Sequence, residues 1–338
     1  MEMKEYIREF TLKDIVTVRN PKVVALGGGT GLSVILRGLK KYTNRLTAIV
    51  TVGDDGGSSG MLRQDLGILP PGDIRNCILA LADDENVMQS LFNYRFTEGG
   101  LEGHNFGNLF LAAMNGISND FYDAVRRTSD VLQIKGRVLP VTLDDMTLNA
   151  SLDNGETVAG ESQIPKAACE KHCRIEKIFL KPDKIEPLEE TLEAIKMAYI
   201  VIIGPGSLYT SVIPNLLVDG IESAIKENRG RKFYVGNIMT QPGETDGYTQ
   251  CDHVRAIEAH LKIKERRLFQ YCVFNSGNLP DYVARQYQKY NSEKVEIGEM
   301  LPEYQYVTDD FIIVENGRIR HDADLLARRI FEAYVNSK

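Results

Sequence analysis

The segment Gly27-Gly28-Gly29-Thr30-Gly31 lies between the apolar run 22–26 and residues 32–39, whose apolar side chains recur at helical spacing. Glycine has no Cβ and lets the main chain approach a ligand, while the following helix offers free N–H groups to negative charge. The order strand, glycine turn, helix therefore predicts a phosphate-binding site. No Gly-Lys-Ser/Thr follows, so this is not a P-loop. Leu32 replaces the third glycine of the dinucleotide fingerprint. The alternative is a tight turn without a ligand.

A second polar segment, Asp54-Asp55-Gly56-Gly57-Ser58-Ser59, follows the apolar run 46–52. Its carboxylates and hydroxyls are suited to Mg²⁺, ribose hydroxyls or phosphate. An acidic residue after the second strand often binds ribose in doubly wound proteins, and Asp54 or Asp55 has that position. Residues 53–60 contain too much glycine for a regular element, so we expect a functional loop. The alternative is a solvated surface turn.

A second glycine turn, Gly204-Pro205-Gly206-Ser207, follows the apolar strand predicted at 199–203. It repeats the order of strand, turn and hydroxyl-rich helix start, which suits the second half of a ligand but also an ordinary βα turn. The segment 236–247 also follows a predicted strand. Glycines bracket it, as in a lid that closes on a ligand. A disordered connection is the alternative.

Other residue patterns give no catalytic assignment. His104-Asn105-Phe106-Gly107-Asn108 opens a predicted helix and suits base or sugar contacts, with His104 more typical of a hydrogen-bonding residue than of an acid or base. Gly160-Glu161-Ser162 lacks the Gly-x-Ser-x-Gly elbow of a hydrolase. Cys169, His172 and Cys173 have no second pair to complete a metal site. We therefore assign no catalytic residue and no metal ligand.

The elements that position these residues alternate between strand and helix in both halves of the chain. Buried, continuously apolar strands favour a parallel sheet with helices on both faces. The expected fold is a doubly wound, mostly parallel Rossmann-like α/β sheet in a single domain, residues 1–338. A β-rich insertion is expected at 140–182, with a hairpin turning at Asn154-Gly155 in a type I′ turn. Asp73 is expected to cap a helix at 74–82, and a hairpin at Asn316-Gly317 and a last helix at 324–334 close the chain.

Composition narrows the classes of function. The chain has 338 residues, a formal charge of −7 and 43% apolar residues, which predicts a folded core and gives no basic surface for nucleic acid. Its five cysteines are scattered, as in a chain of reduced thiols. The charged N-terminus does not resemble a signal peptide, and no apolar run approaches the ~20 residues of a membrane span. We expect a cytoplasmic protein without a transmembrane segment.

The same segments resemble the YvcK-like family of gluconeogenesis factors and, more remotely, the 2-phospho-lactate transferases (CofD) of deazaflavin coenzyme synthesis. The resemblance rests on five blocks, which span residues 22 to about 255: 27–33, 54–60, 70–76, 204–211 and 239–245. It implies a Rossmann-like fold and binding of a UDP-sugar such as UDP-N-acetylglucosamine or UDP-glucose. It also implies a regulatory role in cell shape and wall synthesis during gluconeogenic growth.

Together the residue patterns and the resemblance predict one ligand site. Its candidate contacts are Gly27, Gly28, Gly29, Thr30, Gly31, Leu32, Asp54, Asp55, Gly57, Ser58, Ser59, Asp73, Asn76, Asn108, Gly204, Gly206, Ser207, Tyr209 and Asn237. The first hypothesis is a non-catalytic UDP-sugar sensor that acts on cell-wall synthesis proteins, with a homo-oligomer possible. The second is a CofD-like transferase of a nucleotide-activated phospho-lactate type substrate, which would use Mg²⁺ on Asp54 or Asp55. The third is an NAD-dependent oxidoreductase, suggested by the first glycine turn alone.

Overall fold

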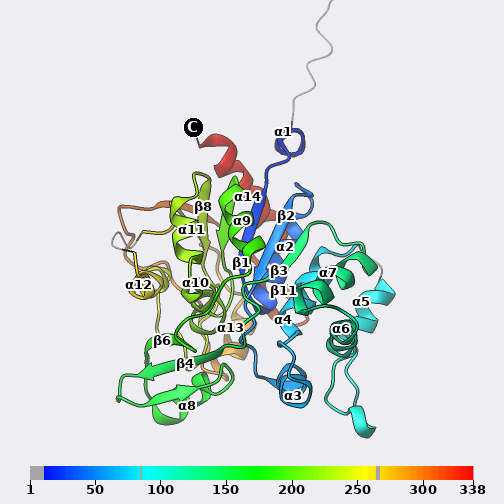
Figure 1. The fold of residues 1–338 in the computed structure, drawn as a ribbon. Coiled ribbons are helices and arrows are strands. Elements are labelled where there is room, and N and C mark those ends of the chain that lie inside the picture. The colour runs from blue at the N-terminus through cyan, green and yellow to red at the C-terminus, as the bar shows by residue number, and fades with distance from the viewer. Residues whose placement is uncertain (1–10, 84–85, 264–266, 338) are drawn as a thin grey trace, which may run out of the picture.

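A parallel seven-stranded sheet forms the centre of the molecule, in the order β10-β9-β8-β7-β1-β2-β3. The computed structural model describes residues 11–83, 86–263 and 267–337 (Figure 1). The strands are β1 Val23–Gly27, β2 Leu46–Val50, β3 Arg137–Pro140, β7 Ile200–Ile203, β8 Arg231–Val235, β9 Tyr271–Asn275 and β10 Gln305–Asp309. The expected doubly wound, parallel sheet is confirmed.

The strand order reverses direction between β1 and β7. From β1 the chain adds β2 and β3 on one side of the sheet, and from β7 it adds β8, β9 and β10 on the other. In such sheets the crevice that binds ligands lies beyond the carboxyl ends of the strands at this reversal. Both glycine turns start there, because β1 ends at Gly27 and β7 ends one residue before Gly204.

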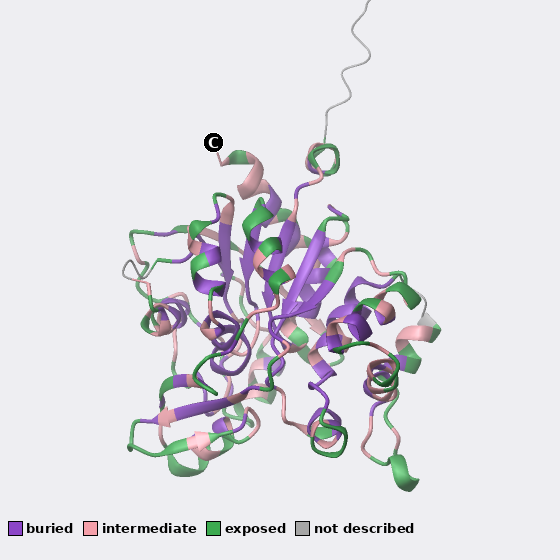
Figure 2. Cartoon of the chain, in the orientation of Figure 1, coloured by how far each residue is buried: buried purple, intermediate pink, exposed green. Residues whose placement is uncertain are grey.

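Continuous apolar strands explain why the sheet is buried on both faces. Every residue of β1, β2, β7 and β9 is buried, and Figure 2 shows the burial running along the central strands. Helices flank the sheet (Figure 1). They are α1 Leu12–Arg19, α2 Gly29–Leu39, α3 Gly57–Leu66, α4 Gly72–Leu81, α5 Asn86–Asn93, α6 Phe106–Gly116, α7 Phe121–Val131, α9 Glu189–Met197, α10 Ile213–Leu217, α11 Ile221–Glu227, α12 Gln250–His260, α13 Asp281–Gln288 and α14 Ala323–Asn336. A 3₁₀ turn, Gly99–Leu101, and a π-helical turn, Leu208–Val212, complete the helical elements.

A small antiparallel sheet, β5-β4-β6, is inserted between β3 and β7 and lies below the carboxyl edge of the main sheet in Figure 1. Its strands are β4 Thr147–Leu152, β5 Thr157–Ala159 and β6 Ile175–Lys181, and helix α8, Ile164–Lys171, crosses between the last two. The expected hairpin is confirmed, but its turn type is not. Gly155 has a φ of +85° whereas Asn154 has no positive φ, so the turn cannot be type I′.

A second hairpin, β11 Ile312–Glu315 and β12 Arg318–His321, precedes α14. Its turn residues Asn316 and Gly317 have φ values of +50° and +71°, as a type I′ turn requires. The hairpin predicted at this dipeptide is confirmed.

Two local expectations were wrong. Residues 53–60 are not free of regular structure, because α3 begins at Gly57. Gly60 is needed there for space: a Cβ would collide with the main chain of Asp55. Asp73 is the second residue of α4 rather than its cap. Pro187 precedes α9, and Gly220, at φ +78°, separates α10 from α11.

Two further expectations concern chemistry and membranes. All five cysteines are described and none forms a disulfide, as the sequence predicted. No helix in the described ranges combines the length and the apolar character needed to cross a bilayer.

Candidate functional site

The two glycine turns touch through their main chains. A Cβ at Gly31 would stand 2.7 Å from the carbonyl oxygen of Pro205, and a Cβ at Gly206 would stand 3.3 Å from that of Gly28. Glycine is therefore required at Gly31 because a neighbouring backbone occupies the space. This contact joins the ends of β1 and β7 into one surface.

A cavity of about 320 Å³ opens on this surface. Seven predicted contacts line it: Gly28, Gly29, Thr30, Gly31, Gly206, Ser207 and Asn237. Volumes of this order fall within the range of small-molecule pockets. The structure thus brings the two glycine turns and Asn237 together around one cavity.

The first turn of α2 supplies the cavity with main-chain N–H groups. The helix starts at Gly29, earlier than the predicted residue 32, and its N-cap Gly28 makes no side-chain capping bond. The first N–H groups of a helix have no partner within the helix, and they carry the positive end of its dipole. This geometry is suited to a phosphate or carboxylate.

Asn237 fixes the second turn. Its side chain donates to the Gly206 carbonyl oxygen at 2.8 Å, and the Gly206 N–H donates back to its Oδ1 at 3.2 Å. Gln250 in turn donates to the Asn237 main chain at 2.5 Å. The position of Gly206 is therefore determined by a chain of amide contacts from two neighbouring segments.

The segment 236–247 is packed rather than open. The Glu244 carboxylate accepts the Ser207 hydroxyl at 2.7 and 2.5 Å and the Tyr209 N–H at 3.3 Å. Burial raises the pKa of Glu244 to about 7, although these hydrogen bonds oppose the shift. Thr245 is fully buried. The segment expected to act as a lid is thus anchored to the second glycine turn.

Half-buried carboxylates gather beside the first glycine turn. Burial and the charge of Asp54 together raise the pKa of Asp73 to about 7, while the Gly29 N–H and Arg75 oppose the shift. Burial, then Asp73 and Asp54, raise the pKa of Glu161 well above its usual range. Glu161 comes from the insertion and was not among the predicted contacts. Its Oε2 is buried without a hydrogen-bond partner.

Asp55 connects the loop that precedes α3 to the β-rich insertion. Its Oδ1 accepts the Ser162 N–H at 2.8 Å, and a Cβ at Gly160 would stand 2.5 Å from its Oδ2. Asp54 accepts the Gly56 N–H at 2.9 Å within the loop. Among the described residues, no set of three or more His, Cys, Asp or Glu side chains is arranged to hold a metal ion.

A third group joins the starts of α3, α4 and α6. Arg75 donates to the side-chain oxygens of Asn76 at 2.8 Å and Asn108 at 2.9 Å. Arginine only donates, so both amides must turn their oxygens toward it and their NH₂ groups away. The Asn108 NH₂ then donates to the Ser59 Oγ at 3.4 Å. Ser58 Oγ accepts the Asn105 N–H at 3.1 Å, so both serine hydroxyl protons remain available as donors.

The remaining predicted contacts do not line the cavity. Leu32 is fully buried in the core, and the Tyr209 hydroxyl lies 2.7 Å from that of Tyr248. The Gly27 carbonyl accepts the Asn215 side chain at 2.9 Å, and Gly204 has a φ of +74°. The predicted residues outside the cavity lining are Gly27, Leu32, Asp54, Asp55, Gly57, Ser58, Ser59, Asp73, Asn76, Asn108, Gly204 and Tyr209.

Sequence reasoning missed the contribution of the C-terminal hairpin. Ile319, Arg320 and His321 of β12 line the same cavity. His321 Nε2 lies 3.2 Å from the Gly236 carbonyl oxygen, and burial lowers the pKa of this histidine to about 4. Arg320 therefore adds a positive charge beside a neutral His321. The turn at Asn316-Gly317 predicted the hairpin, but nothing in the sequence indicated that the hairpin lies beside the glycine turns.

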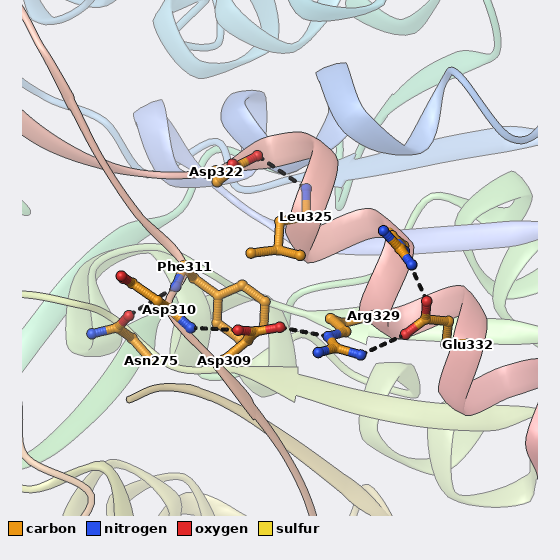
Figure 3. Close-up of polar contacts among 9 residues, drawn as sticks. Asn275, Asp309, Asp310, Phe311, Asp322, Leu325, Arg329 and Glu332 are labelled. Carbon is orange, nitrogen blue, oxygen red and sulfur yellow. Dashed lines mark hydrogen bonds and ion pairs between the residues drawn. The ribbon is translucent and has the colours of Figure 1, made fainter. Parts of the chain in front are cut away.

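Figure 3 shows the polar contacts that hold this hairpin in place. Asn275 at the end of β9 accepts the Phe311 N–H at 3.0 Å. At the end of β10, the Asp309 carboxylate accepts Arg329 Nε–H at 2.6 Å, and Arg329 also donates to Glu332 at 2.9 Å. The ends of β9 and β10 thus hold the segment that leads into the hairpin, and α14, which follows the hairpin, is bound to the end of β10.

The fold and the position of the cavity define a doubly wound, Rossmann-like α/β protein. The family model described as 2-phospho-L-lactate transferase CofD matches residues 23–312. A putative gluconeogenesis factor of Clostridium acetobutylicum is 51% identical over 95% of this chain and 71% of its own. The gluconeogenesis factor of Bacillus subtilis is 45% identical over 91% of this chain and 96% of its own.

A solved structure from Bacillus halodurans, described as a member of the UPF0052 family, is similar as well. It is 44% identical, with a TM-score of 0.85 over 91% of this chain and 98% of its own. The chain belongs to the CofD family and, within it, to the YvcK-like gluconeogenesis factors.

Proposed function

We propose that this protein binds a UDP-sugar, UDP-N-acetylglucosamine or UDP-glucose, and regulates cell shape and wall synthesis under gluconeogenic growth. The observation that carries the proposal is the cavity shared by both glycine turns, with Arg320 on its wall. A diphosphate needs N–H donors and positive charge at one place, and the start of α2 together with Arg320 supplies both. Relatives named gluconeogenesis factors support the physiological part.

Each wall of the cavity has a distinct part in this proposal. Thr30 and Gly31 offer main-chain N–H groups to one phosphate, while the Gly29 N–H donates to Asp73. Gly206 and Ser207 approach the other phosphate. Arg320 offsets part of the negative charge of the two phosphates. The proposal is a binding role and includes no turnover of the ligand, so the hydrogen bond from Ser207 on the cavity wall to the Glu244 carboxylate holds the turn in this scheme. A ligand-dependent surface would then act on cell-wall synthesis proteins in the cytoplasm.

The test is calorimetric titration of the full chain with UDP-N-acetylglucosamine, UDP-glucose, UDP and NAD. We expect both UDP-sugars to bind and Arg320→Ala to weaken them at least tenfold, as loss of a charged hydrogen bond worth about 1.5–3 kcal/mol implies. Arg318→Ala on the same strand is the matched control, because Arg318 does not line the cavity. Binding of NAD alone, or no binding at all, contradicts the proposal.

The half-buried acids favour a second candidate, a CofD-like transferase that acts on a nucleotide-activated phospho-lactate type substrate. Asp54, Asp73 and Glu161 interact electrostatically beside the first glycine turn. In this scheme Asp54 would hold Mg²⁺, and the ion would offset the charge of the acids and of the departing nucleotide. Metal-dependent turnover that Asp54→Asn abolishes, with nucleotide binding retained, would establish this candidate over the sensor.

A further inference from the structure

A second cavity lies at the opposite edge of the main sheet, where β1, β2 and β3 begin. Its volume is about 420 Å³, larger than that of the cavity at the glycine turns. The first residues of β1 and β2 form its floor, and Met197 at the end of α9 forms part of its wall. It shares no lining residue with the cavity at the carboxyl edge.

Three cations line this cavity: Lys22, Arg45 and Arg137. In the described ranges, no carboxylate oxygen lies within 4.0 Å of their charged nitrogens. Lys22 Nζ lies 3.6 Å from the Met197 sulfur, and Arg137 donates to Thr47 Oγ1 at 3.4 Å. Among the described residues Glu193 is the one carboxylate of the lining, so the lining carries three positive charges and one negative charge.

This local charge is opposite to that of the chain as a whole, which is −7. Elsewhere on the surface, exposed cations pair with nearby acids, as Lys41 does with Asp324 and Lys135 with Asp83. Like charges around one hollow repel each other, and an anion placed between them removes that repulsion. Cations that line one hollow without a paired carboxylate therefore favour an anionic ligand there.

The floor of the cavity adds a buried hydroxyl. Thr47 is 6% exposed, and its Oγ1 accepts from Arg137. No hydrogen bond among the described residues uses the hydroxyl proton of Thr47, so this lining residue can also donate to a ligand. The lining thus combines forked guanidinium donors with a hydroxyl donor, a set that matches phosphate or carboxylate oxygens.

We propose that this amino-edge cavity is a second ligand site, which takes a small molecule with at least two negative charges. Arg45, Arg137 and Lys22 bind its anionic groups, and Thr47 donates a hydrogen bond to one of them. The site is separate from the nucleotide cavity and does not depend on the function proposed for it. Phosphate esters and di- or tricarboxylates share the required chemistry.

Calorimetry with inorganic pyrophosphate and with citrate, in 0.15 M salt to screen diffuse surface attraction, tests the proposal. We expect Arg45→Gln and Arg137→Gln each to weaken the better of the two probes at least tenfold. Arg255→Gln is the matched control: it removes the same charge from an exposed arginine that is paired with Asp252. Thr47→Val keeps the shape of the floor and should also weaken binding.

Two results would overturn the second site. The first is an equal loss of affinity in Arg255→Gln, which would mean that only the general charge of the surface matters. The second is complete displacement of the probe by UDP together with unchanged affinity in Arg45→Gln and Arg137→Gln, which would place the probe at the glycine turns. Failure of UDP-sugars to bind would leave these measurements valid, so the two proposals can fail separately.

Discussion

A carboxylate oxygen of Asp73 lies 2.6 Å from the position that a Cβ at Gly28 would occupy. The Gly28 backbone is extended, at φ −163° and ψ 175°, so its conformation would accept any residue. Space alone demands glycine there. The first glycine turn therefore packs closely against Asp73 of α4 as well as against the second glycine turn.

Gly28→Ala should destabilise the fold by about 1–3 kcal/mol, the usual cost of overpacking a fixed site, because the new methyl displaces Asp73 or Thr51. Urea unfolding measures the change. Gly116→Ala at the end of α6 is the matched control, since nothing described lies within 4 Å of its added Cβ. A Gly28→Ala variant as stable as the control would show that Asp73 moves freely.

Asp73→Asn should stabilise the protein at alkaline pH. The pKa of Asp73 is about 7 in the folded chain and 3.8 as a model group, so ionisation favours the unfolded state. Its contribution to stability is complete below pH 3.8 and is lost as pH rises through 7. Asparagine imitates the protonated acid and does not ionise, so the gain in stability should be on the order of 2 kcal/mol larger at pH 8.5 than at pH 5.5.

Urea unfolding at the two pH values checks the Asp73 prediction. Asp65→Asn, on the exposed side of α3, removes the same charge without touching the acidic group. A gain at pH 8.5 no larger in Asp73→Asn than in Asp65→Asn would refute the assigned pKa.

Asn237→Asp should cost about 1–3 kcal/mol, because the Gly206 carbonyl loses its donor and faces an oxygen instead. It should also weaken anionic ligands, since a carboxylate then stands on the cavity wall. Thermal unfolding and UDP titration measure the two effects. Asn154→Asp, in the exposed hairpin turn, is the control. Unchanged affinity in Asn237→Asp would separate the second glycine turn from the ligand site.

Arg75→Met should move the pH dependence of stability upward, because Arg75 lowers the pKa of Asp73 and its loss removes that effect. The midpoint of the stability-against-pH curve reports this shift, which loss of packing alone would not produce. Arg63→Met on α3, where the arginine pairs with Asp145, provides the comparison. Equal midpoints in the two variants would mean that Arg75 is only a packing residue.

The sequence predicted the parts of the fold that depend on local pattern. β1 and β2 are continuously apolar, and each glycine turn follows a strand directly, so the sheet and its binding edge could be inferred. The edge strands β3 and β10 were not identified. Arg137–Pro140 is short and ends in proline, and Gln305–Asp309 mixes polar and apolar residues, so neither has the signal of a buried strand.

The candidate site was predictable only where its residues follow strands. Gly28 to Gly31, Gly206 and Asn237 share one cavity because parallel strands end at a common edge. Arg320 and Glu161 come from hairpins whose docking depends on long-range contacts, and no local pattern indicates which edge a hairpin covers. The orientation of the Asn76 and Asn108 side-chain amides likewise depends on their hydrogen bonds with Arg75, and the sequence does not specify where the Arg75 side chain points.

Because the strand order reverses between β1 and β7, the main sheet combines strands from an early and a late part of the chain. Strands β1 to β3 precede residue 141, and β7 to β10 follow residue 199. The pairing of β1 with β7 therefore joins these two parts of the chain within the main sheet. A molecule that contacts both Gly28 and Gly206 would hold the two parts of the sheet together. Its occupancy would then be reported by slower amide exchange along β7 and β8, well beyond the atoms it touches.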